Sequence, residues 1–468
     1  MKIESMEPMR IKEHSEETCF LCMNNKEFDL PDEVMTALHQ GSLVIFAGAG
    51  ISTEKRGSFP FSFYADVAKE LGIGKDGMLE SFSKLMSRYS KGKNGRKKLL
   101  NKIRARLEYA KSFPSLYQSV TSFHQELAHI HQIRDIFTTN WDDFFEVECG
   151  AIPIVASRDF AFWDIPERKV FKLHGSINNI GSLVVTHEDY IKCYKELSKS
   201  LIGSYLRLAL GTKTVVFIGY SLEDEDFRKV YSLLKRDLAD VLPHSYLVTL
   251  DKQNADKIKS KNITPIITDG TYFLHKLKKE LIKKQVLIDD GVYDVVERLL
   301  ESVLKMHTVM PDIKEFTIQR NPILLYTYFY QDGLIDALQR AIAKKTTGTY
   351  LCPTHIHGQL KLYEEQFRKD AVKAKRYHDV AYIDGYMNGL FLFVMWFIKK
   401  NKMIKNIKNS DLLPPLLYVY GYGEVDGVKE FRKIIKRVFH RGAYKQAQSI
   451  VKRKCPVEGT VMHHSPFL

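Results

Sequence analysis

The sequence predicts an α/β domain with a doubly wound parallel sheet, followed by a mainly α-helical C-terminal domain. Between about residues 40 and 285, short apolar runs rich in β-branched residues alternate with longer segments of helical periodicity. This alternation is typical of parallel α/β sheets. Beyond about residue 290 the strand pattern stops and amphipathic helical patterns replace it. The length of 468 residues also exceeds that of one ordinary domain.

Six apolar runs have the length and composition of buried strands. They are residues 43–48, 133–139, 170–173, 214–219, 245–250 and 264–268. Between them, residues 61–72 and 224–241 carry apolar side chains at three- and four-residue spacing, which predicts helices that connect parallel strands. Together these elements predict a Rossmann-like sheet covered on both faces.

The pattern divides the chain into three parts. Residues 1–35 form an N-terminal arm, residues 36–288 form the sheet domain, and residues 289–468 form a helical domain. The last boundary falls near Asp289-Asp290-Gly291, where the strand signal ends. We expect the helical domain to serve regulation or assembly.

Composition excludes several classes of protein. With 44% hydrophobic and 27% charged residues, the chain is globular and not disordered. The longest strongly apolar stretch, Leu390–Ile398, is shorter than the roughly 20 residues that span a bilayer. The N-terminal residues lack the apolar segment of a secretory signal, and six cysteines are too few for a disulfide scaffold. We therefore expect a cytoplasmic protein without a membrane partner.

Glycines follow the first predicted strand in the motif GAGIS, residues 48–52. Glycines between a strand and a helix let backbone amides approach a pyrophosphate. Because no third glycine completes the pattern GxGxxG, a plain tight turn explains the motif about as well.

Polar residues follow three other predicted strands, at the sheet edge where open α/β sheets bind ligands. In TTNWD, Asn140 and Asp142 suit substrate contact. Alternatively, Asn140 caps the next helix, and Asp142 and Asp143 suit the positive N-terminal end of its dipole. In KLHGS, His174 is a candidate general base, although a lone histidine is more often structural. In GYSLEDEDF, Ser221 and Asp224 suit ribose hydroxyls or helix capping.

The order and spacing of GAGIS, TTNWD, KLHGS and GYSLEDEDF resemble the sirtuin-like family of NAD-consuming enzymes over roughly residues 40–285. The segments FHQELAHI and VVTHEDY resemble its divergent prokaryotic branch. A sirtuin-like domain followed by helices resembles the NAD-depleting effectors of prokaryotic antiviral defence. The resemblance does not reach the C-terminal helices.

The resemblance implies a site for NAD as the substrate. It places Asn140 and His174 at the nicotinamide ribose, with Asp142 as a supporting residue. The residues that would bind NAD are Gly48, Ala49, Gly50, Ser52, Gly219 and Ser221, and Asp224 joins them as a ribose contact.

NAD chemistry needs few protein groups. Nicotinamide leaves as a neutral molecule, so the reaction needs stabilisation of an oxocarbenium-like ribose and a placed nucleophile, without a general acid. Asn140 would orient the ribose or the attacking water, and His174 would accept a proton as the new bond to C1′ forms.

The chain departs from the protein-deacylating sirtuins in two places. Their proline-aspartate-phenylalanine-arginine loop is replaced by STEKRGSFPFSFYADV, residues 52–67, and only Cys193 lies between His174 and Gly219, where they carry a four-cysteine zinc insertion. Water is then the simplest acceptor, which predicts an NAD hydrolase that yields nicotinamide and ADP-ribose. Cyclisation and base exchange share the same intermediate and stay open.

Two other functions stay open as alternatives. A lysine deacylase would need a peptide groove, and a non-enzymatic sensor of NAD or ADP-ribose would need only the binding glycines. A nucleic-acid-binding module is a third, because the formal net charge of +14 and several basic patches favour anionic partners.

An NAD-depleting enzyme needs control, because uncontrolled turnover would kill its host. We expect a homo-oligomer whose helical domain holds the enzyme inactive, with a partner ATPase or a phage or nucleic-acid trigger as its activator.

Cysteines and histidines outside the sheet could bind zinc. Cys19 and Cys22 form a Cys-x-x-Cys pair, and Cys352 and His355 lie in CPTHIH. The two groups are more than three hundred residues apart and nothing in the sequence brings them together. We therefore favour the interpretation that no zinc binds there and assign no metal ligands.

Overall fold

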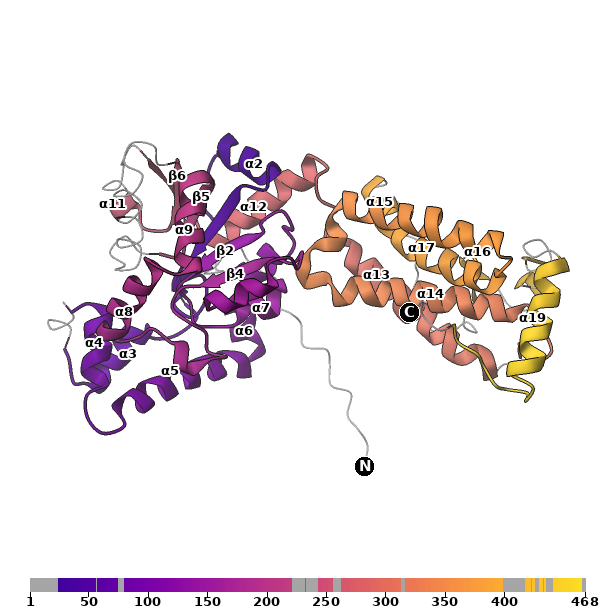
Figure 1. The fold of residues 1–468 in the computed structure, drawn as a ribbon, viewed down its shortest axis with the longest axis horizontal. Coiled ribbons are helices and arrows are strands. Elements are labelled where there is room, and N and C mark those ends of the chain that lie inside the picture. The colour runs from indigo at the N-terminus through magenta and orange to yellow at the C-terminus, as the bar shows by residue number, and fades with distance from the viewer. Residues whose placement is uncertain are drawn as a thin grey trace, which may run out of the picture. The chain divides into compact units, whose positions relative to one another are not determined.

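The computed structural model describes residues 24–55, 57–74, 80–220, 232, 243–255, 262–312, 316–398, 417–421, 423–425, 429–431, 433–434 and 441–464. The chain divides into two compact units (Figure 1). The first comprises residues 1–127 and 132–278, and the second comprises residues 128–131 and 279–468.

The first unit is built on a seven-stranded sheet, and its order is β3-β4-β2-β1-β5-β6-β7. All neighbouring strands in it run parallel. The strands are β1 (Leu43–Ala47), β2 (Asp135–Thr138), β3 (Ile152–Ile154), β4 (Lys169–Lys172), β5 (Thr214–Ile218), β6 (Ser245–Thr249) and β7 (Ile263–Ile267). The predicted fold class is confirmed, and six of the strands match the predicted runs.

The strand β3 is missing from the prediction. It contains Pro153, which has no amide hydrogen to donate to a neighbouring strand and so weakens the strand pattern. The structure accommodates this proline because β3 lies at one edge of the sheet, paired only with β4.

Helices cover both faces of this sheet (Figure 1). Their bounds are α2 (Asp32–His39), α3 (Phe63–Glu70), α4 (Phe82–Tyr89), α5 (Gly95–Ser112), α6 (Pro114–Ala128), α7 (Phe144–Cys149), α8 (His187–Leu197), α9 (Leu201–Thr212), α11 (Lys252–Ala255) and α12 (Gly270–Lys283). Residues of α8 and α9 pack on one face against Phe46, Phe137 and Phe171. On the opposite face, Gly270 at the start of α12 lies so close to Ile218 that a Cβ would come within 2.5 Å of it.

The predicted crossover helix over residues 224–241 lies outside the described residues, except for Ser232, which is helical.

The sheet changes winding direction between β1 and β5. From β1 the chain continues to β2 on one side, and β5 later pairs with β1 on the other side. Such a switch point opens a crevice outside the carboxyl ends of the strands, where open α/β sheets bind ligands.

The second unit is mainly helical, as predicted. Its helices are α13 (Val292–Val309), α14 (Leu324–Ala343), α15 (Pro353–Leu362), α16 (Lys369–Lys373), α17 (Tyr377–Ile398) and α19 (Arg441–Lys454). The expectation that strands stop beyond residue 290 is wrong in one place. An antiparallel hairpin joins β8 (Leu417–Val419) to β9 (Gly423–Val425), and Tyr420 and Gly421 lie in a turn directly after β8.

Glycines bring α14 and α17 together. A Cβ at Gly333 would come within 2.0 Å of the Tyr382 carbonyl oxygen, and one at Gly385 within 1.9 Å of the Tyr330 oxygen. Side chains at either position would therefore force the two helices apart. The 22-residue α17 is long and apolar enough to cross a membrane, and half of its most apolar window is buried inside the protein.

Candidate active site

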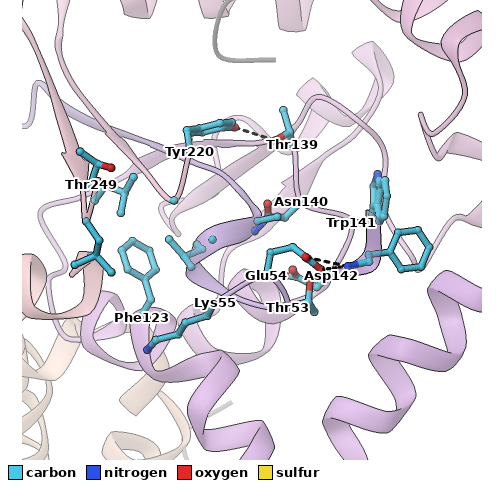
Figure 2. A pocket seen from close by; sticks show the side chains of 18 of the residues that line it. Thr53, Glu54, Lys55, Phe123, Thr139, Asn140, Trp141, Asp142, Tyr220 and Thr249 are labelled. Atoms are coloured by element: carbon cyan, nitrogen blue, oxygen red, sulfur yellow. Dashed lines mark hydrogen bonds between the residues drawn. The ribbon is translucent and has the colours of Figure 1, made fainter. Parts of the chain in front are cut away.

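A cavity of about 560 Å³ lies in the first unit, at the carboxyl edge of the sheet (Figure 2). This volume falls in the range of about 300–1,000 Å³ that is usual for small-molecule sites. Residues that follow β1, β2, β4, β5, β6 and β7 line it, so the cavity occupies the crevice at the switch point. Its walls contain Ala49, Gly50, Asn140, Asp142, His174 and Gly219, six of the ten predicted site residues.

The glycines of the first motif interlock with the loop after β5. Gly48 donates its amide to the Ile218 carbonyl at 2.8 Å, and Gly50 donates to the Gly219 carbonyl at 3.0 Å. A Cβ at Gly48 or Gly50 would come within 2.7 or 2.8 Å of the Gly219 oxygen. Gly219 itself has a φ of +78°, which disfavours other residues. These glycines are therefore required by the close approach of two loops, which together form the floor of the cavity.

Asn140 is held at the cavity by both neighbouring loops. Its amide nitrogen donates to the Gly48 carbonyl and to Ser52 Oγ, both at 3.3 Å. Because a carbonyl can only accept, these contacts fix the amide orientation. The Oδ1 atom is buried and has no hydrogen-bond partner among the described residues, so it is available to a ligand hydroxyl or a water.

The side chain that bonds to the start of helix α7 is that of Asp142 and not that of Asn140. Asp142 Oδ1 accepts from the Phe144 amide at the start of α7, at 3.3 Å. Its Oδ2 atom accepts from the Ser52 hydroxyl at 2.9 Å. Burial raises the pKa of Asp142 above its ordinary value, although Lys172 and the Ser52 hydroxyl act in the opposite direction. Asp142 therefore holds Ser52, and Ser52 in turn holds Asn140.

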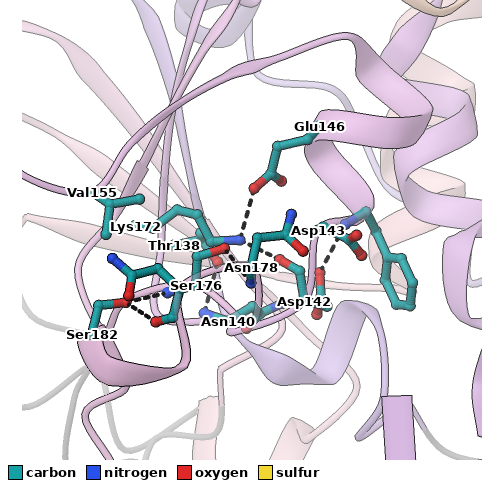
Figure 3. Close-up of polar contacts among 12 residues, drawn as sticks. Thr138, Asn140, Asp142, Asp143, Glu146, Val155, Lys172, Ser176, Asn178 and Ser182 are labelled. Atoms are coloured by element: carbon teal, nitrogen blue, oxygen red, sulfur yellow. Dashed lines mark hydrogen bonds and ion pairs between the residues drawn. The ribbon is translucent and has the colours of Figure 1, made fainter. Parts of the chain in front are cut away.

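A buried lysine supports this carboxylate (Figure 3). The side chain of Lys172 is fully buried, and its Nζ forms an ion pair with Glu146 at 3.1 Å. The same Nζ donates to the backbone carbonyl of Asp142. Burial raises the pKa of Glu146, and Lys172 counteracts that shift. One cation therefore compensates two buried acids behind the cavity wall.

His174 follows β4 and lines the same cavity, with 2% of its surface exposed. Its ring packs edge-on against Tyr190, with the ring centroids 4.9 Å apart. The next residue, Gly175, has a φ of +80°, and a Cβ there would come within 2.2 Å of the Ser182 carbonyl oxygen. Gly175 thus allows the chain to turn sharply and leave His174 at the end of the strand.

Sequence reasoning missed Lys55, which is 92% buried in the cavity wall with 8% of its surface exposed. Its Nζ donates to Ser122 Oγ at 2.7 Å and contacts Thr271 Oγ1 at 3.4 Å. No carboxylate oxygen of the described residues lies within 4.0 Å of this Nζ. Burial lowers the pKa of Lys55, and Asp269 opposes that shift. A buried cation without a directly paired carboxylate suits an anionic ligand.

Sequence reasoning also missed Arg106, which fixes the loop after the glycine motif. Its Nη2 donates to the carbonyls of Thr53 and Phe61, at 3.1 and 3.0 Å, and pairs with Glu54 at 3.1 Å. Burial raises the pKa of Glu54, while Arg106 opposes the shift. Neither residue gave a local sequence signal, because the partners of Lys55 and Arg106 lie about fifty or more positions away in the chain.

Aromatic side chains form another wall of the cavity. Trp141 lies edge-on to Phe63, with centroids 6.2 Å apart, and tilted against Phe82 at 6.1 Å. The indole Nε1 of Trp141 is buried and has no hydrogen-bond partner in the described part of the chain. An aromatic wall with one polar atom suits a planar heteroaromatic ring.

The remaining predicted residues are placed as follows. Ser52 is fully buried and does not line the cavity. Gly48 does not line it either, and its carbonyl accepts the hydrogen bond from the Asn140 amide. Ser221 and Asp224 lie outside the described residues. So do Cys19 and Cys22, whereas the Cys352 thiol lies within hydrogen-bonding distance of Thr354 Oγ1, at 3.1 Å.

Comparison with known proteins supports the resemblance. Residues 134–266 match the family model described as SIR2-like domain. This range contains Asn140, Asp142, His174 and Gly219, whereas the GAGIS motif lies before it. The resemblance to a sirtuin-like family is thereby confirmed for the sheet domain.

Characterised relatives match at low identity. The chain is 27% identical over 262 residues to an NAD(+) hydrolase ThsA of Enterococcus faecium, covering 54% of this chain and 51% of that protein. It is 24% identical over 323 residues to an NAD(+) hydrolase ThsA of Cytobacillus dafuensis, covering 65% and 63%. The defense-associated sirtuin 2 of Bacillus subtilis is 22% identical over 60% of this chain and 27% of its own. The chain thus spans about half to two thirds of the length of the two hydrolases.

Among solved structures, the chain matches one from work on the mechanism and regulation of Sir2 enzymes. The match has 14% identity and a TM-score of 0.31, and covers 55% of this chain and 99% of that one.

Proposed function

We propose that this chain is an NAD glycohydrolase that cleaves NAD to nicotinamide and ADP-ribose. The observation that carries the proposal is the convergence of Asn140, His174 and the glycine loops on one cavity at the switch point of the sheet. The SIR2-like match and the names of the hydrolase relatives support the same activity.

The cavity offers separate places for three parts of NAD. The diphosphate would lie by Ala49 and Gly50, with Lys55 as the neutralising cation. The nicotinamide ring would lie against Trp141, whose free indole N–H suits the carboxamide oxygen. The nicotinamide ribose would then lie beside Asn140, whose Oδ1 can accept from a ribose hydroxyl.

The reaction follows from these positions. The bond between C1′ and the nicotinamide nitrogen breaks, and its electron pair neutralises the pyridinium ring. A water oxygen forms the new bond to C1′, and the water proton passes to His174 and then to solvent. A positioned base contributes about 10²- to 10⁴-fold in rate. Asp142 acts as a positioning residue through Ser52 and needs no contact with the substrate.

Deacylation is the less favoured alternative. Cys193, the only cysteine between His174 and Gly219, donates its thiol to the Leu173 carbonyl at 3.3 Å and is buried. It therefore packs α8 against the sheet. One buried cysteine cannot form the four-cysteine zinc module that lies beside the peptide groove of deacylating sirtuins. A non-enzymatic NAD sensor is the second alternative, and it requires that His174 be dispensable.

We further propose that the enzyme works in the cytoplasm as a regulated effector of antiphage defence. The relatives named for defence and for NAD hydrolysis support this role. Control would come from the helical unit, through a homo-oligomer, a partner ATPase, or a phage or nucleic-acid trigger.

The test is product analysis after incubating the purified protein with NAD. Equal amounts of nicotinamide and ADP-ribose indicate hydrolysis, a cyclic product indicates cyclisation, and loss of acyl groups from an acyl-lysine peptide indicates a deacylase. Binding of NAD with no product, also in the presence of phage extract, nucleic acid or a partner ATPase, would favour the sensor.

A further inference from the structure

Three metal-ligating side chains meet in the helical unit, away from the sequence motifs. His307 lies on α13, Asp332 lies on α14, and His463 lies in the C-terminal segment that follows α19. No other group of three His, Cys, Asp or Glu ligand atoms within the described ranges is this compact. Cys352 and His355, which were considered as zinc ligands from the sequence and were not assigned, do not take part in it.

The three ligand atoms form a nearly regular triangle. His307 Nε2 lies 3.2 Å from Asp332 Oδ1, His463 Nδ1 lies 3.0 Å from the same oxygen, and the two nitrogens lie 3.0 Å apart. In tetrahedral zinc sites with bonds of about 2.0 Å, neighbouring ligand atoms lie ~3.3 Å apart. An ion about 2.0–2.1 Å from all three atoms would sit about 1 Å outside their plane.

Hydrogen bonds alone explain this triangle poorly. Each of the three close atom pairs would need its own proton to be a hydrogen bond. His307 Nε2 and His463 Nδ1 together carry at most two protons. If both protons point at Asp332, two N–H groups face each other at 3.0 Å. A single cation attracts all three atoms at once.

The surroundings of the triangle match those of a metal site. His307 Nδ1 lies 3.0 Å from Gln331 Oε1, an acceptor that fixes the ring so that Nε2 faces the triangle. The His464 amide donates to Asp332 Oδ2 at 2.8 Å, which leaves Oδ1 for the ion. Metal-ligating histidines and carboxylates usually have such second partners.

The segment that carries His463 is held in place independently. Gln319 Nε2 donates to the carbonyls of Cys455, Val457 and Thr460, at 3.2, 2.7 and 3.1 Å. Glu458 pairs with Arg320. The ligand is therefore positioned before any ion binds, while 61% of the His463 side chain is exposed and leaves an entry path.

We propose that His307, Asp332 and His463 bind a divalent transition metal of the zinc type, which fastens the C-terminal segment to α13 and α14. Two imidazoles and one carboxylate suit zinc, and water would complete the coordination. This site is independent of NAD chemistry, so its failure would leave the proposed hydrolase untouched.

The test is zinc binding by the full-length protein after removal of metals with a chelator, measured by equilibrium dialysis and elemental analysis. We expect one zinc per chain in the wild type and in His357→Ala, which removes an exposed histidine of the same unit. We expect at least a tenfold loss of affinity in His463→Ala and in Asp332→Asn.

Two further measurements separate this site from others. The double variant Cys19→Ser/Cys22→Ser should keep its zinc, and zinc should slow backbone hydrogen exchange in residues 456–464 of the wild type but not of His463→Ala. The proposal is overturned if the wild type binds no zinc, or if zinc persists in a folded His463→Ala and disappears with the two cysteines.

Discussion

The hydroxyl of Ser52 donates a hydrogen bond of 2.9 Å to Asp142, although the two residues are 90 positions apart in the chain. The same hydroxyl accepts from the Asn140 amide at 3.3 Å. The loop after β1 is thereby connected to the loop after β2, beneath the cavity. Together with the Gly48 carbonyl, this connection holds the Asn140 side chain at the cavity.

Replacing Ser52 by alanine should impair turnover more than binding. The substitution Ser52→Ala removes the connection, leaves a buried Asp142 oxygen without a donor, and costs about 1–3 kcal/mol of stability. A displaced Asn140 should lower kcat by about 10²-fold, with a smaller change in KM for NAD. Steady-state kinetics measure both constants.

The matched control is Ser58→Ala, in the same loop, whose hydroxyl contacts Ser119 at 3.2 Å instead. An equal loss of kcat in both variants would show that the loop as a whole matters and not the contact with Asn140.

Asp142→Asn should stabilise the fold at neutral pH while it impairs catalysis. The folded-state pKa of Asp142 is raised by burial. Its contribution to stability is therefore fully present below its ordinary pKa of about 3.9 and is lost as the pH rises through the raised value. The neutral amide avoids this loss, so thermal unfolding should show an advantage for the variant that grows as the pH rises above about 3.9 and levels off above the raised pKa. A variant less stable than the wild type throughout this range would refute the assigned direction.

Lys55→Met should weaken NAD binding by about 10- to 100-fold, which corresponds to about 1.4–2.7 kcal/mol. Only the ammonium form attracts the diphosphate, and burial lowers the Lys55 pKa. Wild-type affinity should therefore decline as the pH rises, beginning below the ordinary lysine pKa of about 10.4. Calorimetric titration with NAD at several pH values measures this decline.

Lys69→Met, at an exposed position of α3, is the control for Lys55. If Lys55→Met binds NAD as tightly as the wild type and shows the same pH profile, Lys55 does not contact the diphosphate.

Lys172→Met should destabilise the first unit by about 3–5 kcal/mol, because it leaves buried carboxylates without their cation. Denaturant unfolding measures the loss, and Lys192→Met, whose side chain is 78% exposed, should change stability little. The double variant Lys172→Met/Glu146→Gln should recover part of the loss. No recovery would mean that Lys172 acts chiefly through the Asp142 carbonyl.

Local sequence patterns predicted most of the sheet because its buried strands are short and apolar, as in TVVFIG. They failed at β3, where Pro153 obscures the pattern and the edge position tolerates it. They also failed at the hairpin β8–β9, because its strands of three residues each are too short to give an alternating pattern.

The candidate site was predictable where residues follow strands, since parallel strands end at one edge. This is why Asn140 and His174 could be placed together before the structure was known. The roles of Lys55 and Arg106 depend on contacts with residues about fifty or more positions away, which local patterns do not encode. For the same reason the sequence did not distinguish Asn140 as a helix cap from Asn140 as part of the cavity.

The most direct measurement is the rate of nicotinamide release from NAD by the wild type, Asn140→Ala and His174→Ala, with NAD binding measured in the same samples. The exposed residues Asn101 and His39 provide the controls Asn101→Ala and His39→Ala. We predict that the wild type and both controls release nicotinamide and ADP-ribose equally, while Asn140→Ala and His174→Ala stay folded, bind NAD and lose at least 10²-fold in rate. Undiminished release by a folded His174→Ala or Asn140→Ala would contradict the assignment of this cavity as the active site.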